Sequence, residues 1–551
     1  MPIPRHERPD MTEFAAAVEV IVRSRLVDDP VRATWAGLHD YDAELPDLTA
    51  DGIAQSRANL SADIARLADF TPGDLTPGER LDHRLLTAML QVDLRERTEL
   101  QPERHDPSLY PSVAADGVYS ILARDFAPLE QRLPSVVARL RKVPGVFAAA
   151  KQNLERSPRV WTEIAIDETE GTVEFFDETV SPLLADRAEG RAALAAAIEA
   201  ARDYERFLKE RHLQRDGMAF AVGRDFFDYK LRHEHFLAHT AATLVEFGEE
   251  AIRLTRFRLQ EVAARIDPAS TWDALIDTLR NDTPSESSLL DEYRRSLDQA
   301  RSFVIDRKLA TMPPGESLVI VETPIFVRPT IPYAAYMAPG MFDVRQQGLY
   351  YVTPLDADAT PQSRREQLLG HNRYGMLLTN VHEGYPGHHL QLVHANRAPS
   401  LVRRYSDSSV LCEGWALYCE QMVLDEGISS DLRMRLFQLK DQLWRACRVV
   451  IDAKLHTGES TFDQAVDMLV DVAKLERVNA IGEVRRYTQS PTQPMSYLVG
   501  KQQILDLRER ERQRLGQNFD LHAFHDRLLS YGSIPVALIA ESEGAAEETL
   551  G

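Results

Sequence analysis

The 551-residue sequence contains little cysteine, with only Cys412, Cys419 and Cys447. Small secreted folds stapled by disulfides carry many more cysteines at regular spacings, so this sequence excludes a disulfide framework. Cysteine thiolates are soft metal ligands, but burial in the core is the favoured interpretation of Cys412 and Cys419. Free thiols are typical of a reducing compartment, and we therefore expect a cytoplasmic protein.

Long hydrophobic runs are also missing. No segment approaches the roughly 18 consecutive apolar residues that indicate a membrane-spanning helix. The opening residues, MPIPRHERPDMTEFAAAVEVIVRSR, contain no uninterrupted apolar stretch and no small-residue cleavage site, so no signal peptide is expected. These absences predict no membrane partner.

Positive charge is scarce as well. The sequence has 64 Lys and Arg against 85 Asp and Glu, a formal net charge of −21. Because proteins that bind phosphate backbones gather net positive charge, nucleic acid is not an expected partner. The 44% hydrophobic and 27% charged residues are ordinary for a globular protein and argue against long disorder. Oligomeric state is not indicated by the sequence.

Most of the sequence has the periodicity of amphipathic helices. Leu, Val, Ala and Phe recur at spacings of three and four among strong helix formers, which predicts helices over Leu129–Glu155, Ala192–His212, Ala238–Ile266, Asp431–His456 and Thr461–Leu475. Pro134 and Pro144 predict helix starts or kinks in the first of these. A chain of this length is expected to form two large lobes or one elongated helical body.

One region departs from the helical pattern. Residues 317–353, SLVIVETPIFVRPTIPYAAYMAPGMFDVRQQGLYYVT, are rich in β-branched and aromatic residues and are broken by Pro324, Pro329, Pro332 and Pro339. Proline cannot donate to a strand ladder, so this composition predicts a few short edge strands with irregular connections. We place a soft boundary near Ala310, between an N-terminal helical lobe (1–310) and a lobe that carries the site (311–551), within one continuous fold.

The strongest chemical signal is a cluster of histidines. Four of the 16 histidines lie between His382 and His394, and Glu413 follows His388 by 25 residues. Two imidazoles and a distant carboxylate, with a second carboxylate at Glu383 beside the first imidazole, are the ligand set and general base of an open catalytic zinc site. The sequence therefore predicts that His382, His388 and Glu413 bind Zn²⁺ on helices within 374–424, and that Glu383 is the base.

The identity of the second histidine ligand is open between two neighbours. The familiar zinc helix has two histidines four residues apart, whereas here Pro386-Gly387 lengthens the interval. On an undistorted helix, residues seven apart share a face, which selects His389. If Pro386-Gly387 loops out because proline breaks the helix, His388 takes the second position. We favour His388, and interpret His394 as a surface residue or a neighbour of the ligands.

Supporting groups are predicted from what hydrolysis at zinc requires. A tetrahedral oxyanion needs a hydrogen-bond donor besides the metal, and Tyr497 is the candidate, although a core tyrosine is nearly as good an interpretation; Tyr487 is the second choice. Glu420 either orients a ligand histidine or forms a surface ion pair. Planar guanidinium groups hold carboxylates well, so Arg328 and Arg486 are the candidates for substrate binding.

The same motifs resemble a known family. Val381–Gln391 (VHEGYPGHHLQ), Glu413–Tyr418 (EGWALY), and the segment from Arg486-Tyr487 to Gln493–Gly500 (QPMSYLVG) are similar to the DUF885 family, as are Trp35–Asp42 (WAGLHDYD) and Leu45-Pro46-Asp47 near the N-terminus. The resemblance covers essentially the whole chain. Asp452 and His456 also fall in a family-like stretch, where a local helix contact is favoured over a role beside the ligands.

The resemblance implies a mainly α-helical, two-lobed fold with a deep cleft, similar to gluzincin peptidases of the thimet-oligopeptidase type. It also implies a zinc metallopeptidase that cleaves short peptides, with a glutamate ligand about 25 residues after the second histidine. The insertion of Pro386-Gly387 between the histidines departs from the motif of those peptidases. Two alternatives remain open: a zinc hydrolase of a non-peptide amide or specialised metabolite, and a binding protein without turnover.

Overall fold

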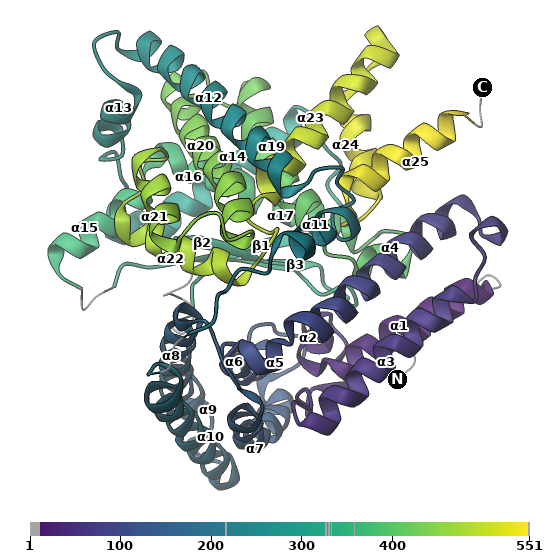
Figure 1. The fold of residues 1–551 in the computed structure, drawn as a ribbon. Helices are drawn as coiled ribbons and strands as arrows, with labels where there is room; N and C mark the ends of the chain where they lie inside the picture. The colour runs from purple at the N-terminus through teal and green to yellow at the C-terminus, as the bar shows by residue number, and fades with distance from the viewer. Residues whose placement is uncertain are drawn as a thin grey trace.

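The computed structural model describes residues 11–214, 217–324, 328, 331, 333–356 and 359–548. It is mainly helical, as expected, with one small sheet (Figure 1). The N-terminal helices are α1 (Glu13–Asp28), α2 (Pro30–Trp35), α3 (Ala50–Ala68), α4 (Pro77–Arg95), α5 (Pro102–His105), α6 (Leu109–Leu122), α7 (Leu129–Asn153), α8 (Arg159–Glu174), α9 (Ser181–Leu183) and α10 (Ala188–Phe207). Next come α11 (Arg224–His233), α12 (Ala241–Ile266), α13 (Trp272–Leu279) and α14 (Leu289–Asp306).

The sheet follows α14, and the remaining helices complete the molecule. The strands are β1 (Ser317–Glu322), β2 (Ala334–Met337) and β3 (Gln347–Val352). After them come α15 (Pro361–Gly370), α16 (Arg373–Glu383), α17 (His388–Ala395), α18 (Leu401–Tyr405), α19 (Ser409–Asp425), α20 (Leu432–His456), α21 (Phe462–Asp471), α22 (Arg477–Gln489), α23 (Ser496–Leu515), α24 (Leu521–Ser530) and α25 (Val536–Glu548). No helix among the described residues is long and apolar enough to cross a membrane.

The predicted helices form close to their expected bounds. Asp431 and Thr461, the first residues of two predicted helices, are the N-caps of α20 and α21, where their side chains accept backbone N–H bonds. Side chains of this type satisfy amide groups that have no partner inside the helix, and so set where it begins. Pro134 and Pro144 both lie within the continuous helix α7, so neither begins a new helix.

The three strands form one mixed sheet in the order β1-β3-β2. β1 is parallel to β3 and β2 is antiparallel to it, so β3 is the central strand and the expectation that every strand is an edge was wrong for β3. The prolines are consistent with this arrangement: Pro324 and Pro339 lie outside the strands. Pro329 and Pro332 lie outside the described residues.

The sheet separates two hydrophobic cores. Tyr350 and Val352 of β3 pack into a core that combines α1, α4, α14, α16, α19 and α23. Leu349 and Tyr351, which alternate with them along the strand, pack against a second core made mainly by α6–α10. Successive strand residues point to opposite faces, so β3 contributes to both cores. Figure 1 shows the strands in the middle of the molecule, with α6–α10 below them and the later helices above.

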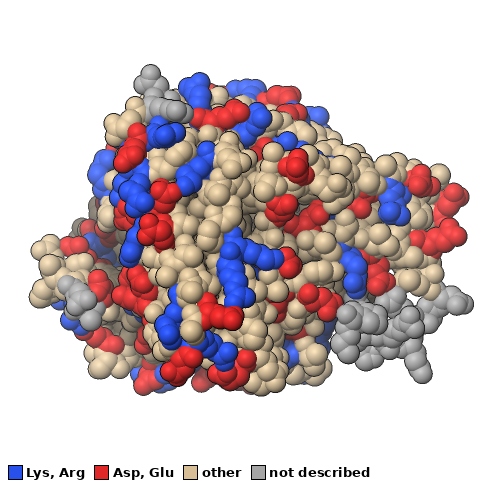
Figure 2. Space-filling model, turned by 90° about the horizontal axis from the view of Figure 1, so that it is seen from below, with Lys and Arg blue, Asp and Glu red and all other residues tan. Residues whose placement is uncertain are grey.

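The helices before Ala310 do not all pack with the N-terminal part. Residues of α14 share a core with α16, and α12 runs along α20. The long connection between α10 and α12 therefore carries the chain from one core to the other. At the surface, acidic and basic side chains are interspersed over the face shown in Figure 2.

Candidate metal centre

The first predicted ligand and the predicted base lie at the end of α16. Asn372 caps the start of this helix by accepting the amide N–H of Gly375 at 2.8 Å. Leu377 and Val381 bury one face of α16 in the central core. His382 and Glu383 are the last two residues of the helix. The packing of one helical face therefore fixes the end of α16, and with it the position of both functional side chains.

A tight turn separates α16 from α17. Proline lacks the amide proton and clashes with a continuing helix, and the backbone folds back so that the Gly387 N–H donates to the Val381 carbonyl at 3.0 Å. A β-carbon on Gly387 would lie 1.9 Å from the carbonyl oxygen of His382, so only glycine fits there. The Trp415 indole N–H donates to the Pro386 carbonyl at 2.7 Å and ties the turn to α19.

This turn places the two neighbouring histidines in different surroundings. His388 begins α17, and its Nε2 lies 3.3 Å from Glu413 Oε2. His389 is fully buried and turned elsewhere, with its Nε2 2.8 Å from Glu316 Oε2 and its Nδ1 3.0 Å from the Tyr336 hydroxyl. The break at Pro386 thus brings His388, and not His389, to the carboxylate.

Helix α19 supplies two carboxylates on one face. Glu413 faces the histidines, and Glu420, two turns later, is 3% exposed and lies with its Oε1 2.7 Å from His382 Nδ1. A carboxylate on the far nitrogen of a ligand histidine fixes the ring orientation and leaves the other nitrogen for a metal. Of the two interpretations of Glu420, the structure therefore shows the contact with His382 and not a surface ion pair.

The three predicted ligands lie together at distances that suit one ion. The ligand atoms of His382, His388 and Glu413 all lie within 4.8 Å of one another, and His382 Nε2 is 3.7 Å from Glu413 Oε2. Two ligands bound at about 2.0–2.1 Å in a tetrahedral site are roughly 3.4 Å apart. Glu413 Oε2 is buried without a hydrogen-bond partner, as expected of an atom that binds a cation. The donor set therefore fits Zn²⁺.

The charges in this cluster are strongly coupled. Burial opposes a charge on His382, but Glu413 and Glu420 outweigh it and raise the pKa of His382 to about 10. Burial favours protonation of Glu413, yet the two histidines reverse this and hold its pKa well below the usual range. The carboxylate is therefore ionised, as a metal ligand must be, and metal binding would release the His382 proton.

Glu383 lies beside the ligands among aromatic side chains. Burial raises the pKa of its carboxyl, while His382 and His388 act in the opposite direction. The pKa values of Tyr336 and Tyr350 are raised chiefly by burial and also by the charge of Glu383. The side chain of Glu383, at the end of α16, makes no hydrogen bond with any described residue, so its carboxylate oxygens are available to a water or a substrate.

Tyr497 contacts His382 directly, whereas Arg486 reaches the ligands through Gln493. The Tyr497 ring is stacked on the His382 ring, with centroids 6.2 Å apart and planes at 17°. Arg486 pairs with Glu483 at 2.9 Å and donates to Gln493 at 3.2 Å. Gln493 Nε2 lies 3.5 Å from Glu413 Oε1, so Arg486 is linked to the ligands through one intervening side chain.

Arg328 has a different environment. Its Nε donates to the Thr323 carbonyl at 2.9 Å and its Nη2 lies 3.9 Å from Glu322. These contacts tie it to the end of β1, and none of its described contacts involves a ligand, so its binding of substrate stays a prediction. Tyr487 is fully buried, and its hydroxyl accepts the Trp444 indole N–H at 3.2 Å.

Other predicted side chains serve the packing around the centre. Asp452 accepts the amide N–H groups of Thr492 and Met495, each at 3.1 Å, and so fixes the segment that precedes Tyr497. His456 Nε2 lies 2.9 Å from the Tyr487 carbonyl and 3.9 Å from Asp452. His394 lies 2.8 Å from the Thr311 carbonyl, away from the ligands. Cys412, Cys419 and Cys447 are all buried and free.

Several residues near the centre gave no signal in the sequence. Glu316 accepts bonds from Tyr385 at 2.5 Å and Arg301 at 2.9 Å besides its contact with His389. Arg448 of α20 stacks on Tyr497, with its guanidinium carbon 4.0 Å from the ring centroid. Neither residue lies in a motif that marks it: Arg448 meets Tyr497 through the packing of α20 against α23, and Glu316 meets His389 across 73 residues of sequence.

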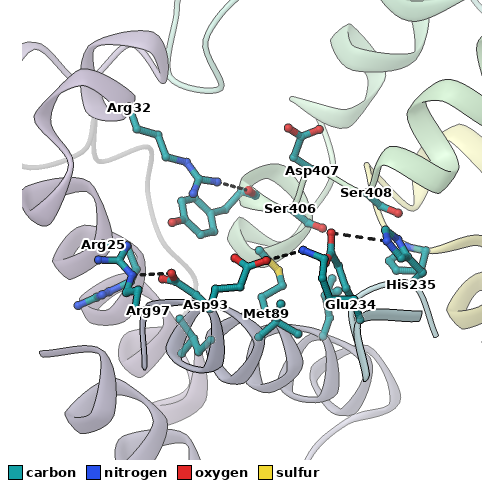
Figure 3. Close-up of a pocket in the computed structure, with 17 residues that line it drawn as sticks. Arg25, Arg32, Met89, Asp93, Arg97, Glu234, His235, Ser406, Asp407 and Ser408 are labelled. Atoms are coloured by element: carbon teal, nitrogen blue, oxygen red, sulfur yellow. Dashed lines mark hydrogen bonds and ion pairs between the residues drawn. The ribbon is translucent and has the colours of Figure 1, made fainter. Parts of the chain in front are cut away.

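The cavity in Figure 3 is separate from this centre. It has a volume of about 440 Å³ and lies between α1, α4 and the segment from Tyr405 to Ser408. Its lining charges are mostly paired with one another, for example Arg97 with Asp93 at 2.6 Å. None of the predicted ligands lines it. The cavity and the candidate metal centre therefore lie in different parts of the molecule.

Comparisons with known proteins agree with the sequence motifs. The family model "Bacterial protein of unknown function (DUF885)" matches residues 30–542. A solved structure of a "putative lipoprotein of unknown function" from Shewanella oneidensis is 29% identical, with a TM-score of 0.80 over 96% of this chain and 99% of the other. A second "putative lipoprotein", from Colwellia psychrerythraea, is 17% identical, with a TM-score of 0.82 over 98% and 99% of the two chains, and shows the fold alone. No curated protein matches.

Proposed function

This chain belongs to the DUF885 family, whose function is not assigned, and from its own residues we propose that it is a zinc-dependent hydrolase that cleaves the peptide bonds of short peptides. The observation that carries the proposal is the convergence of His382, His388 and Glu413 within 4.8 Å, with Glu383 adjacent in sequence to the first ligand. The kinship with gluzincin peptidases and their substrate cleft is part of the same proposal.

The open coordination is the chemical reason for preferring an enzyme to a structural site. Structural zinc sites use four protein ligands, whereas catalytic sites keep a position for water, and three donors meet here. When bound, Zn²⁺ supplies Lewis acidity and lowers the pKa of water towards neutrality. A purely structural site would have no use for the free carboxylate of Glu383.

Glu383 accepts the proton of the attacking water and later delivers it to the leaving amine. A carboxyl whose pKa is raised by burial is better matched to proton transfer near neutral pH than an exposed one. Burial raises the pKa values of Tyr293, Tyr336 and Tyr350, and the charge of Glu383 adds to this effect, so the carboxyl lies in the neighbourhood of three buried aromatic rings. The half-buried Tyr497 beside His382 can donate its hydroxyl hydrogen to the developing oxyanion.

Three variants test the proposal. Glu383→Gln should retain zinc and lose at least about 100-fold in turnover, because removal of a general base typically costs this much or more. His382→Ala should lose both zinc and turnover. Glu366→Gln is the matched control, because it makes the same substitution at an exposed residue of α15, and it should behave as the wild type. Zinc is measured by elemental analysis, and turnover by mass spectrometry of a peptide library.

The same experiment separates the remaining alternatives. A protein with one zinc per chain that leaves every peptide intact would overturn the peptidase proposal. Loss of a metabolite by the wild type but not by Glu383→Gln would then indicate a non-peptide amide substrate. Unchanged thermal stability with and without a chelator, together with no turnover, would indicate a binding protein instead.

We retain a cytoplasmic location as part of the proposal, on the basis of the free cysteines. The description "putative lipoprotein" belongs to the two similar proteins. Fractionation of cells that express the full-length protein, with detection of the protein in cytoplasmic and membrane fractions, tests the location.

A further inference from the structure

Three arginines lie over the rings of Tyr497 and Tyr487 beside the candidate metal centre. The guanidinium carbon of Arg448 lies 4.0 Å from the Tyr497 ring centroid, and that of Arg445 lies 5.8 Å from it. Arg486 lies over the neighbouring Tyr487, with its guanidinium carbon 5.3 Å from that ring centroid. The Tyr497 ring also stacks on the ring of His382, a predicted metal ligand. Tyr497 therefore contacts both the arginines and the candidate metal centre.

Arg448 is buried without an acceptor for its donors. Its side chain is 2% exposed, and its Nε and Nη2 have no hydrogen-bond partner among the described residues. Its contacts are instead the faces of Trp444, Tyr487 and Tyr497. Burial of an unpaired guanidinium is costly, so a stable protein is expected to use this group for an anion that the chain itself does not supply.

The surrounding carboxylates do not balance these charges. Glu483 is the acid associated with both Arg486 and Arg448, which together hold the pKa of its carboxyl down at about 2 against the effect of burial. Its side chain pairs with Arg486 at 2.9 Å, and Asp441 lies 3.9 Å from Arg445. Arg448 therefore has no direct ion pair among the described residues. The side chain of Arg486, which does pair with Glu483, is 43% exposed.

We propose that Arg448, with Arg486 and Arg445, binds a free carboxylate of the substrate. The proposal rests on the proposed hydrolase function and names its substrate class: an amide whose leaving amine carries a carboxylate, as at the C-terminus of a peptide. Guanidinium groups bind carboxylates through charge-assisted, often bidentate, hydrogen bonds. The protein is then a C-terminal exopeptidase.

The spacing agrees with a carboxylate close to the bond that is cleaved. The centroid of the His382 ring is 6.2 Å from the centroid of the Tyr497 ring. The guanidinium carbon of Arg448 is 4.0 Å from the Tyr497 centroid. Consecutive Cα atoms of an extended peptide lie about 3.8 Å apart. A carboxylate bound at Arg448 would therefore belong to a residue close in sequence to the cleaved bond.

The test compares paired substrates that differ only in this group. An N-acetylated tripeptide of alanine, alanine and phenylalanine is supplied as the free acid and as the carboxamide. The wild type should cleave the acid with a kcat/KM about 10- to 100-fold above that of the amide, which is the range for hydrogen bonds to a charged group. Arg448→Met should remove this preference, so that the ratio of kcat/KM for the acid to kcat/KM for the amide falls to about one.

Two further variants serve as a control and as a replacement if Arg448→Met does not fold. Arg433→Met is the matched control, because Arg433 lies on the same helix α20 but pairs with Asp431 at the surface at 2.7 Å, and it should keep the preference. If Arg448→Met lacks a cooperative thermal transition, the more exposed Arg486→Gln replaces it and should reduce the preference at least about threefold, because it removes one of the surrounding charges.

A binding measurement separates the failure of this inference from the failure of the hydrolase proposal. Zinc-loaded Glu383→Gln is titrated calorimetrically with the acid and the amide, and tighter binding of the acid supports the carboxylate site even if no turnover occurs. Equal cleavage and equal binding of acid and amide would overturn the site while leaving the hydrolase intact. A preference that survives in Arg448→Met would also overturn it. Cleavage of a benzoylated amino acid, but not of the tripeptide acid, would assign the carboxylate to a non-peptide amide.

Discussion

One ligand of the candidate metal centre is held by a side chain that does not itself bind the metal. This ligand is His382, since Glu420 holds its Nδ1 at 2.7 Å while Nε2 faces Glu413. Replacing Glu420 with glutamine keeps the size of the side chain but removes the charge that fixes the ring. We expect Glu420→Gln to weaken zinc binding about 10- to 100-fold, as is usual for the partner of a ligand histidine, in competition titrations with a chromophoric chelator.

A control for this prediction lies near the end of the same helix. Glu426 caps the C-terminus of α19 and lies 4.0 Å from Arg508, and its side chain is partly exposed. Glu426→Gln therefore removes the same charge without touching His382 and should leave the zinc affinity within about twofold, because exposed ion pairs contribute little. Equal losses in both variants would show that net charge, and not the contact with His382, controls the affinity.

Among single residues, the sequence was sufficient to assign those candidate site residues whose arrangement depends on local spacing. His382, Glu383 and His388 lie within one short segment, so the proline between the histidines was enough to favour His388 over His389. Arg448 could not be assigned in this way, because its relation to Tyr497 depends on how α20 meets α23. Glu316 meets His389 across 73 residues of sequence, and nothing near Glu316 indicates this contact.

The turn between α16 and α17 is the element on which the centre depends. The β-carbon of alanine at position 387 would lie 1.9 Å from one backbone carbonyl and 2.3 Å from another, and neither atom can move without shifting the end of α16. Gly387→Ala should therefore lower the free energy of unfolding by about 1–3 kcal/mol, the usual cost of forced crowding, and displace His388. Urea unfolding and zinc content together measure both effects.

Gly145 in α7 provides the comparison. An added β-carbon meets nothing within 4 Å there, and glycine inside a helix is less stable than alanine by up to about 1 kcal/mol. Gly145→Ala is expected to be neutral or stabilising and to keep its zinc. If Gly387→Ala is as stable and as fully loaded as Gly145→Ala, then the turn is not what positions His388.

Helices were easier to predict than strands for a physical reason. Asp431–His456 was expected and α20 spans Leu432–His456, because helical periodicity and caps are local properties of the sequence. The strand region was recognised from its composition, but the central place of β3 depends on its pairing with β1 and β2. The β1–β3 pairs join residues 30 positions apart and the β2–β3 pairs join residues 12 to 18 positions apart, and composition does not encode these pairings.

For the whole molecule, the question is which segments fold together. A boundary near Ala310 was a natural prediction, because the composition changes there from helical to strand-rich. The packing joins segments across this position: α12 lies along α20 and α14 packs on α16. The buried residues of the central core run from Phe14 to Ile539. A division of the chain by composition thus cuts through interfaces on which the helices of the candidate metal centre depend.

Two fragments test whether the chain folds as separate halves. Residues 311–551 contain all three ligands but lack α12 and α14, whereas residues 217–551 retain both. Without these helices the apolar faces of α16 and α20 are exposed, and each large side chain left in water forfeits about 1.5–3 kcal/mol. We expect the shorter fragment to aggregate or unfold without a cooperative transition, and the longer one to bind zinc more tightly and melt at a higher temperature in circular dichroism. Equal melting and equal zinc affinity of the two fragments would instead show that the segment after Ala310 folds alone, and that α12 and α14 only cover a centre that is already formed.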